Sequence, residues 1–324
     1  MNHKNLLYLS RRDVELINLP MPTIIEALEE MFKEKCNGRV EMPPKPGIHP
    51  RADSFIHAMP AFIPSSGAAG VKWVSGFPDN LERNLPYISG LLILNDAETG
   101  IPIAVMDCTW ITAKRTGAAT AVAAKYLARP ECSTAGIVAC GVQGRSNLEA
   151  LANVFPLQEA KAFDVVPEIA DEFACEMAQT LGYEVETVGT VREAVEGLDL
   201  VVTSGPILQN PSPTLEAGWL KPGAFACPLD FDSYWKGSAL AEIDKLATDD
   251  LAQLDYYRSV GYFGETPQPY ADLGEILAGK RPARESEDER TLSINLGLAL
   301  EDMATARLIY REAVSRRIGI VLEL

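Results

Sequence analysis

The chain has 324 residues, 47% hydrophobic and 23% charged, a balance typical of a globular protein that is long enough for two domains. Its formal net charge of −16 argues against nucleic-acid and anionic-membrane partners, because both need a basic face. The six scattered cysteines and three histidines predict neither a metal site nor a disulfide framework. With no apolar run long enough for a bilayer and no cleavable apolar leader, we expect a cytoplasmic protein.

The first third of the chain predicts a small antiparallel sheet with one helix. Residues 13–36 carry a helical pattern, and Pro22 is well placed to begin its second part. The proline-crowded segment 38–67 favours edge strands and rigid turns. The runs 70–78 and 87–107 are rich in β-forming residues, with "NDAETG" marking a hairpin turn inside the second run.

From residue 116 onward, helical and strand patterns alternate. An alanine-rich helix is predicted to begin near Thr116 and to stop at Pro130, and a long amphipathic helix is predicted over 290–317. Between them we predict strands, several joined by helices, at 135–140, 159–165, 184–188, 198–205, 223–229 and 244–250. This rhythm indicates a parallel sheet with crossover helices. The predicted fold class is therefore α/β: a Rossmann doubly wound parallel-sheet domain at 129–304, and a second α/β domain at 1–128 to which the C-terminal helix 305–324 returns.

The stretch "GIVACGVQGRSNLEAL" has the layout of a dinucleotide-binding turn between a strand and a helix. The expected G-x-G-x-x-G begins with Ala139, while Gly141 and Gly144 hold the second and third glycine positions. Asp164 ends the next strand, where a carboxylate accepts the ribose hydroxyls of NAD and repels the extra phosphate of NADP. An ordinary strand-to-helix junction is the alternative, and Arg145 beside the turn keeps NADP open.

Three cations of the first domain could surround one small acid. Lys72 lies on a predicted strand between Val71 and Trp73, where it either snorkels to the surface or meets an anion inside. Arg115 directly precedes the predicted alanine-rich helix, and an arginine beside free helix N–H groups makes a carboxylate clamp; the alternative is a surface arginine. Thr112 could add a hydroxyl, and Lys45 stands between prolines, where alone it would be an exposed loop lysine.

Segments spread over nearly the whole chain resemble the ornithine cyclodeaminase/mu-crystallin family. The resemblance is carried, in the expected order, by "GVKWVSGFPDN", "LLILNDAETGIPIAVMDCTWITAKRTGAATAVAAKYLARP", "GIVACGVQG", "LKPGAF", "LGEILAGKRPAR" and "LGLALEDMATARLIY". It implies an NAD(P)-dependent homodimer in which a Rossmann domain is joined to a substrate-binding domain whose strands form the dimer interface. It also implies a small α-amino or α-imino acid as substrate, with NAD as the expected cofactor and NADP possible.

The resemblance assigns roles residue by residue. Lys72 and Arg115 match two carboxylate-binding cations, while Lys45 replaces the usual arginine and loses its bidentate fork. Asp232 matches the catalytic aspartate, with Asp230 as the alternative, and His57 stands where ornithine cyclodeaminases carry a glutamate. The implied site comprises Asp232 and Lys72 as catalytic residues; Lys45, His57, Lys72, Thr112 and Arg115 around the substrate; and Gly141, Val142, Gln143, Gly144, Asp164, Thr203, Ser204, Asp232, Asn295 and Gly297 around the cofactor.

The expected function is NAD(P)-dependent hydride transfer between nicotinamide and the α-carbon of an α-amino or α-imino acid, as in an amino-acid dehydrogenase or an imine reductase. Two alternatives stay open: a cyclodeaminase that recycles its NAD internally, and a non-catalytic NAD(P)H-binding protein like the mu-crystallins. The histidine at position 57 disfavours ornithine, because it lacks the fixed negative charge of a glutamate. The substrate side chain and the physiological direction stay open.

Overall fold

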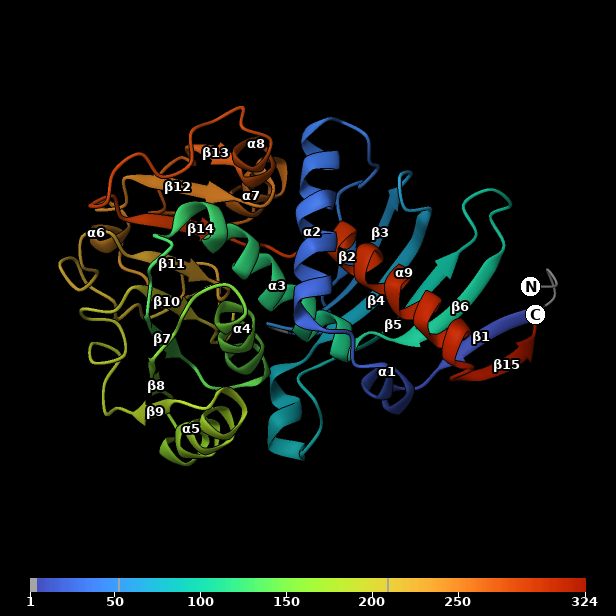
Figure 1. Ribbon diagram of the computed structural model, residues 1–324, viewed down its shortest axis with the longest axis horizontal. Coiled ribbons are helices and arrows are strands. Elements are labelled where there is room, and N and C mark those ends of the chain that lie inside the picture. The colour runs from blue at the N-terminus through green and yellow to red at the C-terminus, as the bar shows by residue number, and fades with distance from the viewer. Residues whose placement is uncertain (1–4, 52, 209) are drawn as a thin grey trace. The chain divides into compact units, whose positions relative to one another are not determined.

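The computed structural model describes residues 5–51, 53–208 and 210–324 (Figure 1). Its contacts divide the chain into two compact units: unit 1, Met1–Arg115 with Leu298–Leu324, and unit 2, Thr116–Gly297. The sequence-based division places its boundaries after residues 128 and 304 instead, which assigns the whole of helix α3 (Thr109–Leu127) to the first domain.

Unit 1 is built on a seven-stranded sheet in the order β15-β1-β6-β5-β4-β3-β2. Its strands are β1 (Asn5–Leu9), β2 (Gly47–Ile48), β3 (Phe55–Ile63), β4 (Ala68–Gly76), β5 (Ile88–Asn95), β6 (Pro102–Asp107) and β15 (Ile320–Glu323). The predicted strands β4 to β6 and the hairpin turn after β5 are confirmed. The predicted antiparallel sheet is confirmed for β2 to β6, but the sheet is larger than predicted, because β1 joins in parallel with β6 and β15 pairs with β1. Both added strands are too short to leave a strong periodic pattern.

Helices α2 (Met21–Cys36) and α9 (Ala299–Arg316) pack together, and α9 lies against strands β3, β4 and β5 (Figure 1). The helical pattern over 13–36 breaks as predicted, because α1 (Arg11–Ile17) ends at Asn18 in the left-handed conformation and Pro22 lies in the first turn of α2. A short 3-10 helix, η1 (Pro78–Arg83), follows β4. Side chains alternate along β4, so Lys72 and Val74 are buried while Trp73 on the other face is 50% exposed.

Unit 2 confirms the predicted doubly wound sheet. Its eight strands are β7 (Thr134–Val138), β8 (Glu159–Phe163), β9 (Glu184–Thr187), β10 (Leu200–Thr203), β11 (Phe225–Pro228), β12 (Lys245–Thr248), β13 (Ala271–Asp272) and β14 (Thr291–Ile294). They run in the order β13-β12-β14-β11-β10-β7-β8-β9, and every neighbouring pair in the described part of the sheet is parallel. The chain winds outward from β7 on one side and from β10 on the other, so the topological switch point lies between these two strands.

The long helix predicted over 290–317 is wrong at its beginning and right only from Ala299. The first part is strand β14, which inserts between β11 and β12 with all four of its residues buried. A short buried strand has no alternation, so its apolar run reads as a continuation of the helix that follows. The C-terminal end also differs from the prediction of a helix over 305–324, because α9 ends at Arg316 and β15 follows.

The helices of unit 2 are α4 (Val142–Ala152), α5 (Pro167–Leu181), α6 (Gly237–Leu240), α7 (Leu251–Ser259) and α8 (Leu273–Leu277). The predicted start of α3 near Thr116 is wrong: this helix begins seven residues earlier, at Thr109. The Asp107 carboxylate accepts hydrogen bonds from the amide and the hydroxyl of Thr109 and so caps the start. Residues such as Ile111 have modest helix propensity, but Ile111 is fully buried, and packing overrides propensity here. In the described residues, none of the helices has the length and apolarity required to span a membrane.

Candidate active site

Lys72 is buried in unit 1 rather than snorkelling to the surface. Only 1% of its side chain is exposed, and its Nζ lies 2.6 Å from Asp302 Oδ2 and 3.5 Å from Thr112 Oγ1. Burial lowers the pKa of the Lys72 ammonium, while the Asp302 carboxylate opposes that shift. The lysine therefore meets an anion inside the protein, as one of the two interpretations of its sequence environment requires.

Arg115 lies in the interior of α3, so the prediction that it precedes a helix start is wrong. Its own helix already uses the N–H groups expected to be free there, because α3 begins at Thr109. The guanidinium instead meets two carboxylates of α9: Nη1 lies 2.6 Å from Glu301 Oε2, and Nε lies 3.2 Å from Asp302 Oδ1. Thr112, one turn earlier on α3, stands beside Lys72.

Glu301 and Asp302 complete what we call the buried charge cluster: Lys72, Arg115, Glu301 and Asp302. Both acids lie in the first turn of α9, where a helix dipole favours negative charge, and both are fully buried. Burial raises the pKa of Glu301, although Arg115 opposes the shift. Neither acid is predicted from the sequence to belong to the site. The available signal was two adjacent acids in "LGLALEDMATA", a helix start that is otherwise apolar or small on every side.

His57 on β3 and the half-buried Lys45 lie near each other at the edge of the same sheet. The His57 ring stacks on Phe55 with 4.4 Å between centroids, and Gly47 of β2 is its strand partner. Burial, and then the nearby Lys45 charge, lower the pKa of His57 to about 4. Lys72 adds to the same shift, so these predicted substrate residues lie within electrostatic range of one another. His57 is thus neutral near pH 7.

The glycine turn of unit 2 has the conformation that its spacing predicts. Ala139 adopts the left-handed conformation with a φ of 72°, which glycine takes more easily, and its amide donates to the Phe163 carbonyl at 2.8 Å. A Cβ on Gly141 would meet no heavy atom within 4 Å. A Cβ on Gly144 would lie 2.8 Å from the Ala139 carbonyl oxygen, so this glycine allows α4 to approach β7. The first N–H groups of α4 lack helical acceptors and suit an anion beside Gly141.

Asp164 and Arg145 flank this turn. The Asp164 carboxylate accepts hydrogen bonds from the amides of Cys140 at 2.8 Å and Val166 at 3.0 Å, and its side chain is half-buried. Arg145 Nε lies 2.6 Å from Glu176 Oε2, and its Nη1 donates to the Cys140 carbonyl. The arginine that kept NADP open therefore already has a carboxylate partner. Val142 is exposed and Gln143 is half-buried at the start of α4.

The two candidate aspartates differ sharply in their surroundings. Asp230, after β11, is fully buried; Thr203 Oγ1 donates to its Oδ1 at 2.8 Å, and Trp235 Nε1 donates to Thr203 Oγ1 at 3.0 Å. Burial raises the pKa of Asp230 to about 7. Asp232 is half-buried with Thr266 Oγ1 3.4 Å from its Oδ2, and burial raises its pKa as well.

Phe231 separates the two carboxylates in a strained conformation. Its φ of 62° is unusual for a bulky residue, which favours the right-handed regions. Its ring packs against Tyr257, Tyr262 and Phe263 with centroid distances of 4.8, 5.3 and 4.8 Å. This aromatic cluster compensates for the backbone strain and fixes the loop that carries both aspartates.

Further residues of the predicted cofactor set gather at the carboxyl ends of the unit 2 strands. Ser204 Oγ, after β10, donates to the Ala139 carbonyl at 2.8 Å. Ser293 Oγ, in β14, donates to Asn295 Oδ1 at 2.8 Å. After β14, the Gly297 amide donates to Asp249 Oδ2 at 2.8 Å. Ligands of doubly wound sheets bind outside the carboxyl ends of the strands, beside the switch point. In the part of the chain that the structure describes, no cluster of histidine, cysteine or acidic side chains has metal-ligating geometry.

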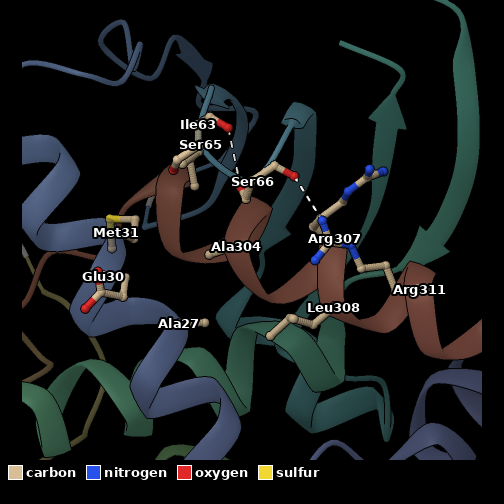
Figure 2. Close-up of a pocket in the computed structure, with 10 residues that line it drawn as sticks. All are labelled: Ala27, Glu30, Met31, Ile63, Ser65, Ser66, Ala304, Arg307, Leu308 and Arg311. Carbon is tan, nitrogen blue, oxygen red and sulfur yellow. Dashed lines mark hydrogen bonds between the residues drawn. The ribbon is translucent and has the colours of Figure 1, made fainter.

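A separate pocket of unit 1 lies between α2 and α9 (Figure 2). Its lining includes Met31, Ile63, Arg307 and Arg311, and Arg311 Nη2 donates to the Ser66 carbonyl at 3.4 Å. It contains none of the site residues predicted from the sequence. The candidate site therefore rests on the charge cluster, the glycine turn and the aspartate loop rather than on this pocket.

The parallel sheet wound outward from β7 and β10, with its glycine turn, defines a Rossmann-type protein. Residues 5–317 match the ornithine cyclodeaminase/mu-crystallin family, and the chain belongs to it. The alanine dehydrogenase of Archaeoglobus fulgidus is 36% identical, over 97% of each chain.

Two solved structures are similar over almost their whole length. The Δ1-pyrroline-2-carboxylate reductase of Thermococcus litoralis, in complex with NADH and L-proline, is 35% identical with a TM-score of 0.88, covering 97% of this chain and 99% of that one. An archaeal alanine dehydrogenase dimer with bound NAD is 33% identical with a TM-score of 0.88, covering 99% of each chain.

Substitutions of the two turn glycines should have different effects. Gly144→Val places atoms against the Ala139 carbonyl and Ile137, and we expect it to lower the free energy of unfolding by about 2–3 kcal/mol. Gly141→Ala meets open space, so stability should change by less than about 1 kcal/mol while its methyl group weakens NADH binding about tenfold or more. Urea unfolding and NADH fluorescence titration measure the two effects. Equal destabilisation by both changes would contradict this account of the turn.

Asp230→Asn should stabilise the protein most at alkaline pH. The folded-state pKa of Asp230 is raised from 3.8 to about 7, so the wild type loses stability as the pH rises from about 4 to about 7. The variant keeps the Thr203 hydrogen bond and escapes this loss, which should be about 2–3 kcal/mol between pH 5 and pH 8. Urea unfolding at both pH values tests this, with the exposed Asp255→Asn as control. Parallel curves for wild type and Asp230→Asn would contradict it.

Proposed function

We propose that this protein is an NAD-dependent oxidoreductase that transfers hydride between nicotinamide and the α-carbon of a small α-amino or α-imino acid. The observation that carries the proposal is the burial of two cations, Lys72 and Arg115, in a protein with a net charge of −16. Such cations recognise a carboxylate locally where the overall field repels it. Two relatives support this class: an alanine dehydrogenase, and a Δ1-pyrroline-2-carboxylate reductase solved with NADH and L-proline.

The residues of unit 2 fit the dinucleotide that this reaction needs. The open space over Gly141 and the N–H groups of Val142, Gln143 and Gly144 suit a pyrophosphate. The Asp164 carboxylate suits the ribose hydroxyls, and the pairing of Arg145 with Glu176 favours NAD over NADP. We assign the nicotinamide end to Thr203, Ser204, Asn295 and Gly297. The coenzyme, when bound, accepts or supplies the hydride.

Unit 1 would bind the acid, and the aspartate loop would move the proton. Lys72 and Arg115 orient the substrate carboxylate, which is catalysis chiefly by positioning, and Thr112 and Lys45 add polar contacts. Asp232 takes the proton from the substrate nitrogen or returns it. We favour Asp232 over Asp230 because it is half-exposed, whereas Asp230 is fully buried and bound to Thr203. Burial raises the pKa of Asp232 toward the neutral pH range, which suits a group that exchanges a proton with the substrate.

His57 separates this proposal from cyclodeamination. A diamino acid such as ornithine carries a second ammonium group, which a fixed negative charge would hold. His57 offers no charge near pH 7, because burial lowers its pKa to about 4. We therefore propose a substrate without a cationic side chain, and a reaction with a net change of NADH.

The test is a screen that follows NADH absorbance. L-Alanine and L-proline are offered with NAD, and pyruvate with ammonia or Δ1-pyrroline-2-carboxylate is offered with NADH. We expect net oxidation or reduction with at least one of these acids. Ammonia release from L-ornithine without a net NADH change would instead indicate a cyclodeaminase. NADH binding without turnover of any acid would indicate a binding protein.

Asp232→Asn should lower turnover about a hundredfold or more, because a general acid–base group is lost, while NADH affinity stays within about twofold. Stopped-flow rates and NADH fluorescence measure these quantities. The exposed Asp255→Asn serves as the charge-matched control. Near-normal turnover in Asp232→Asn, with loss in Asp230→Asn, would transfer the role to Asp230.

We further propose that the chain works as a homodimer that pairs through the unit 1 sheet. Trp73 and Leu91 are cross-strand neighbours on β4 and β5 and are 50% and 47% exposed, on the face that α9 leaves open. Large apolar side chains side by side on a sheet face favour a protein partner. The archaeal alanine dehydrogenase solved with bound NAD is a dimer, which supports a second copy as that partner.

Replacing the pair Trp73 and Leu91 with glutamate should convert a dimer into a monomer, since burying two carboxylates in an apolar interface is costly. Light scattering after size-exclusion chromatography measures the mass. Tyr256→Glu, an exposed aromatic position on α7, should leave the mass unchanged. A wild type that elutes as a monomer would contradict the homodimer.

A further inference from the structure

The buried charge cluster is electrically balanced before any substrate arrives. It holds two cations, Lys72 and Arg115, and two carboxylates, Glu301 and Asp302, with side chains at most 8% exposed. A substrate carboxylate added to fully ionised groups would leave an excess negative charge away from water. Buried excess charge is costly, and proteins relieve such a cost by neutralising a group.

The two carboxylates are not equivalent. Asp302 bridges the cations, with Oδ2 2.6 Å from Lys72 Nζ and Oδ1 3.2 Å from Arg115 Nε. Glu301 contacts Arg115 through Oε2 alone, at 2.6 Å. Its Oε1 is buried with no hydrogen-bond partner among the described residues. A proton on Glu301 therefore disturbs one ion pair, whereas a proton on Asp302 would disturb two.

The groups facing Glu301 come from two helices. Arg115 of α3 lies against it and Asp302 is its neighbour on α9, while Lys72 of β4 and Cys108 lie beyond Asp302. Burial raises the pKa of the Cys108 thiol to about 11, so it stays neutral at physiological pH. Burial also raises the pKa of Glu301, which lowers the cost of placing a proton there.

We propose that binding of the substrate carboxylate to Lys72 and Arg115 is coupled to uptake of one proton by Glu301. The proton comes from solvent, and the cluster with its bound acid stays neutral. Asp302 remains ionised and positions both cations. This inference rests on the proposed function, because it takes a carboxylate as the ligand of the cluster.

The coupling fixes the sign of the pH dependence. Below the pKa that Glu301 has in the ligand-free protein, the proton is already present, and the affinity for the acid is constant. As the pH rises through that pKa, binding must first recruit a proton, so affinity for the acid falls by up to about tenfold per pH unit. A glutamine at position 301 imitates the protonated acid at every pH, and the dependence should vanish.

The experiment uses tetrahydrofuran-2-carboxylate and L-lactate, which carry a carboxylate but no titrating nitrogen. Their inhibition constants are measured from about pH 6 to about pH 9 against whichever acid the enzyme turns over, for wild type, Glu301→Gln and Glu312→Gln. Glu312 is an exposed residue of α9 and matches the charge change. We expect the constants to rise with pH in wild type and Glu312→Gln, and to stay flat in Glu301→Gln. Calorimetry of wild type in buffers of different ionisation enthalpy should show proton uptake approaching one per site.

The same pH slope in Glu301→Gln as in wild type would overturn the proposal and assign the titration to Lys72. Carboxylate binding without proton uptake in alkaline buffer would overturn it too, without any variant. Failure of the proposed function looks different, because neither probe then binds and no acid is turned over at any pH.

Discussion

The ion pair between Lys72 and Asp302 is the constraint on which unit 1 depends. An ammonium group that is 1% exposed persists only with a partner, and the carboxylate lies 2.6 Å away on α9. The partner comes from the far end of the chain, so the sheet of the first hundred residues is incomplete until α9 covers it. Replacing either charge alone would strand the other away from water, which makes the pair a requirement of the fold and of the proposed chemistry.

Unit 2 depends on a different constraint, the approach of backbone to backbone at the carboxyl ends of its strands. Gly144 brings α4 close to β7, and Ala139 tolerates a left-handed turn although it lacks the freedom of glycine. Hydrogen bonds from Ala139 to Phe163 and from Ser204 to Ala139 hold this turn to its neighbours. The departure from the glycine motif thus has a local structural compensation.

The fold class was predictable, because alternating strands and helices over residues 135–250 leave a strong periodic pattern. Strand β14 was not predictable, because a fully buried strand is as uniformly apolar as the start of the helix that follows it. Lys72 and Arg115 were recognisable as isolated cations. Their carboxylate partners on α9 lie at least 186 positions further along the chain. Local pattern carries no information about such pairing. The true start of α3 was hidden for a related reason, because packing and the Asp107 cap decide it rather than propensity.

Phe231 shows how a hydrophobic cluster can set the burial of neighbouring carboxylates without any charged group of its own. Its ring is held by Tyr257, Tyr262 and Phe263, and its backbone then turns Asp230 inward while Asp232 keeps access to water. The backbone conformation of Phe231 therefore determines which of the two carboxylates is buried and which is exposed. Substitutions among these aromatic residues could therefore change the pKa and the solvent exposure of the two carboxylates without replacing either aspartate.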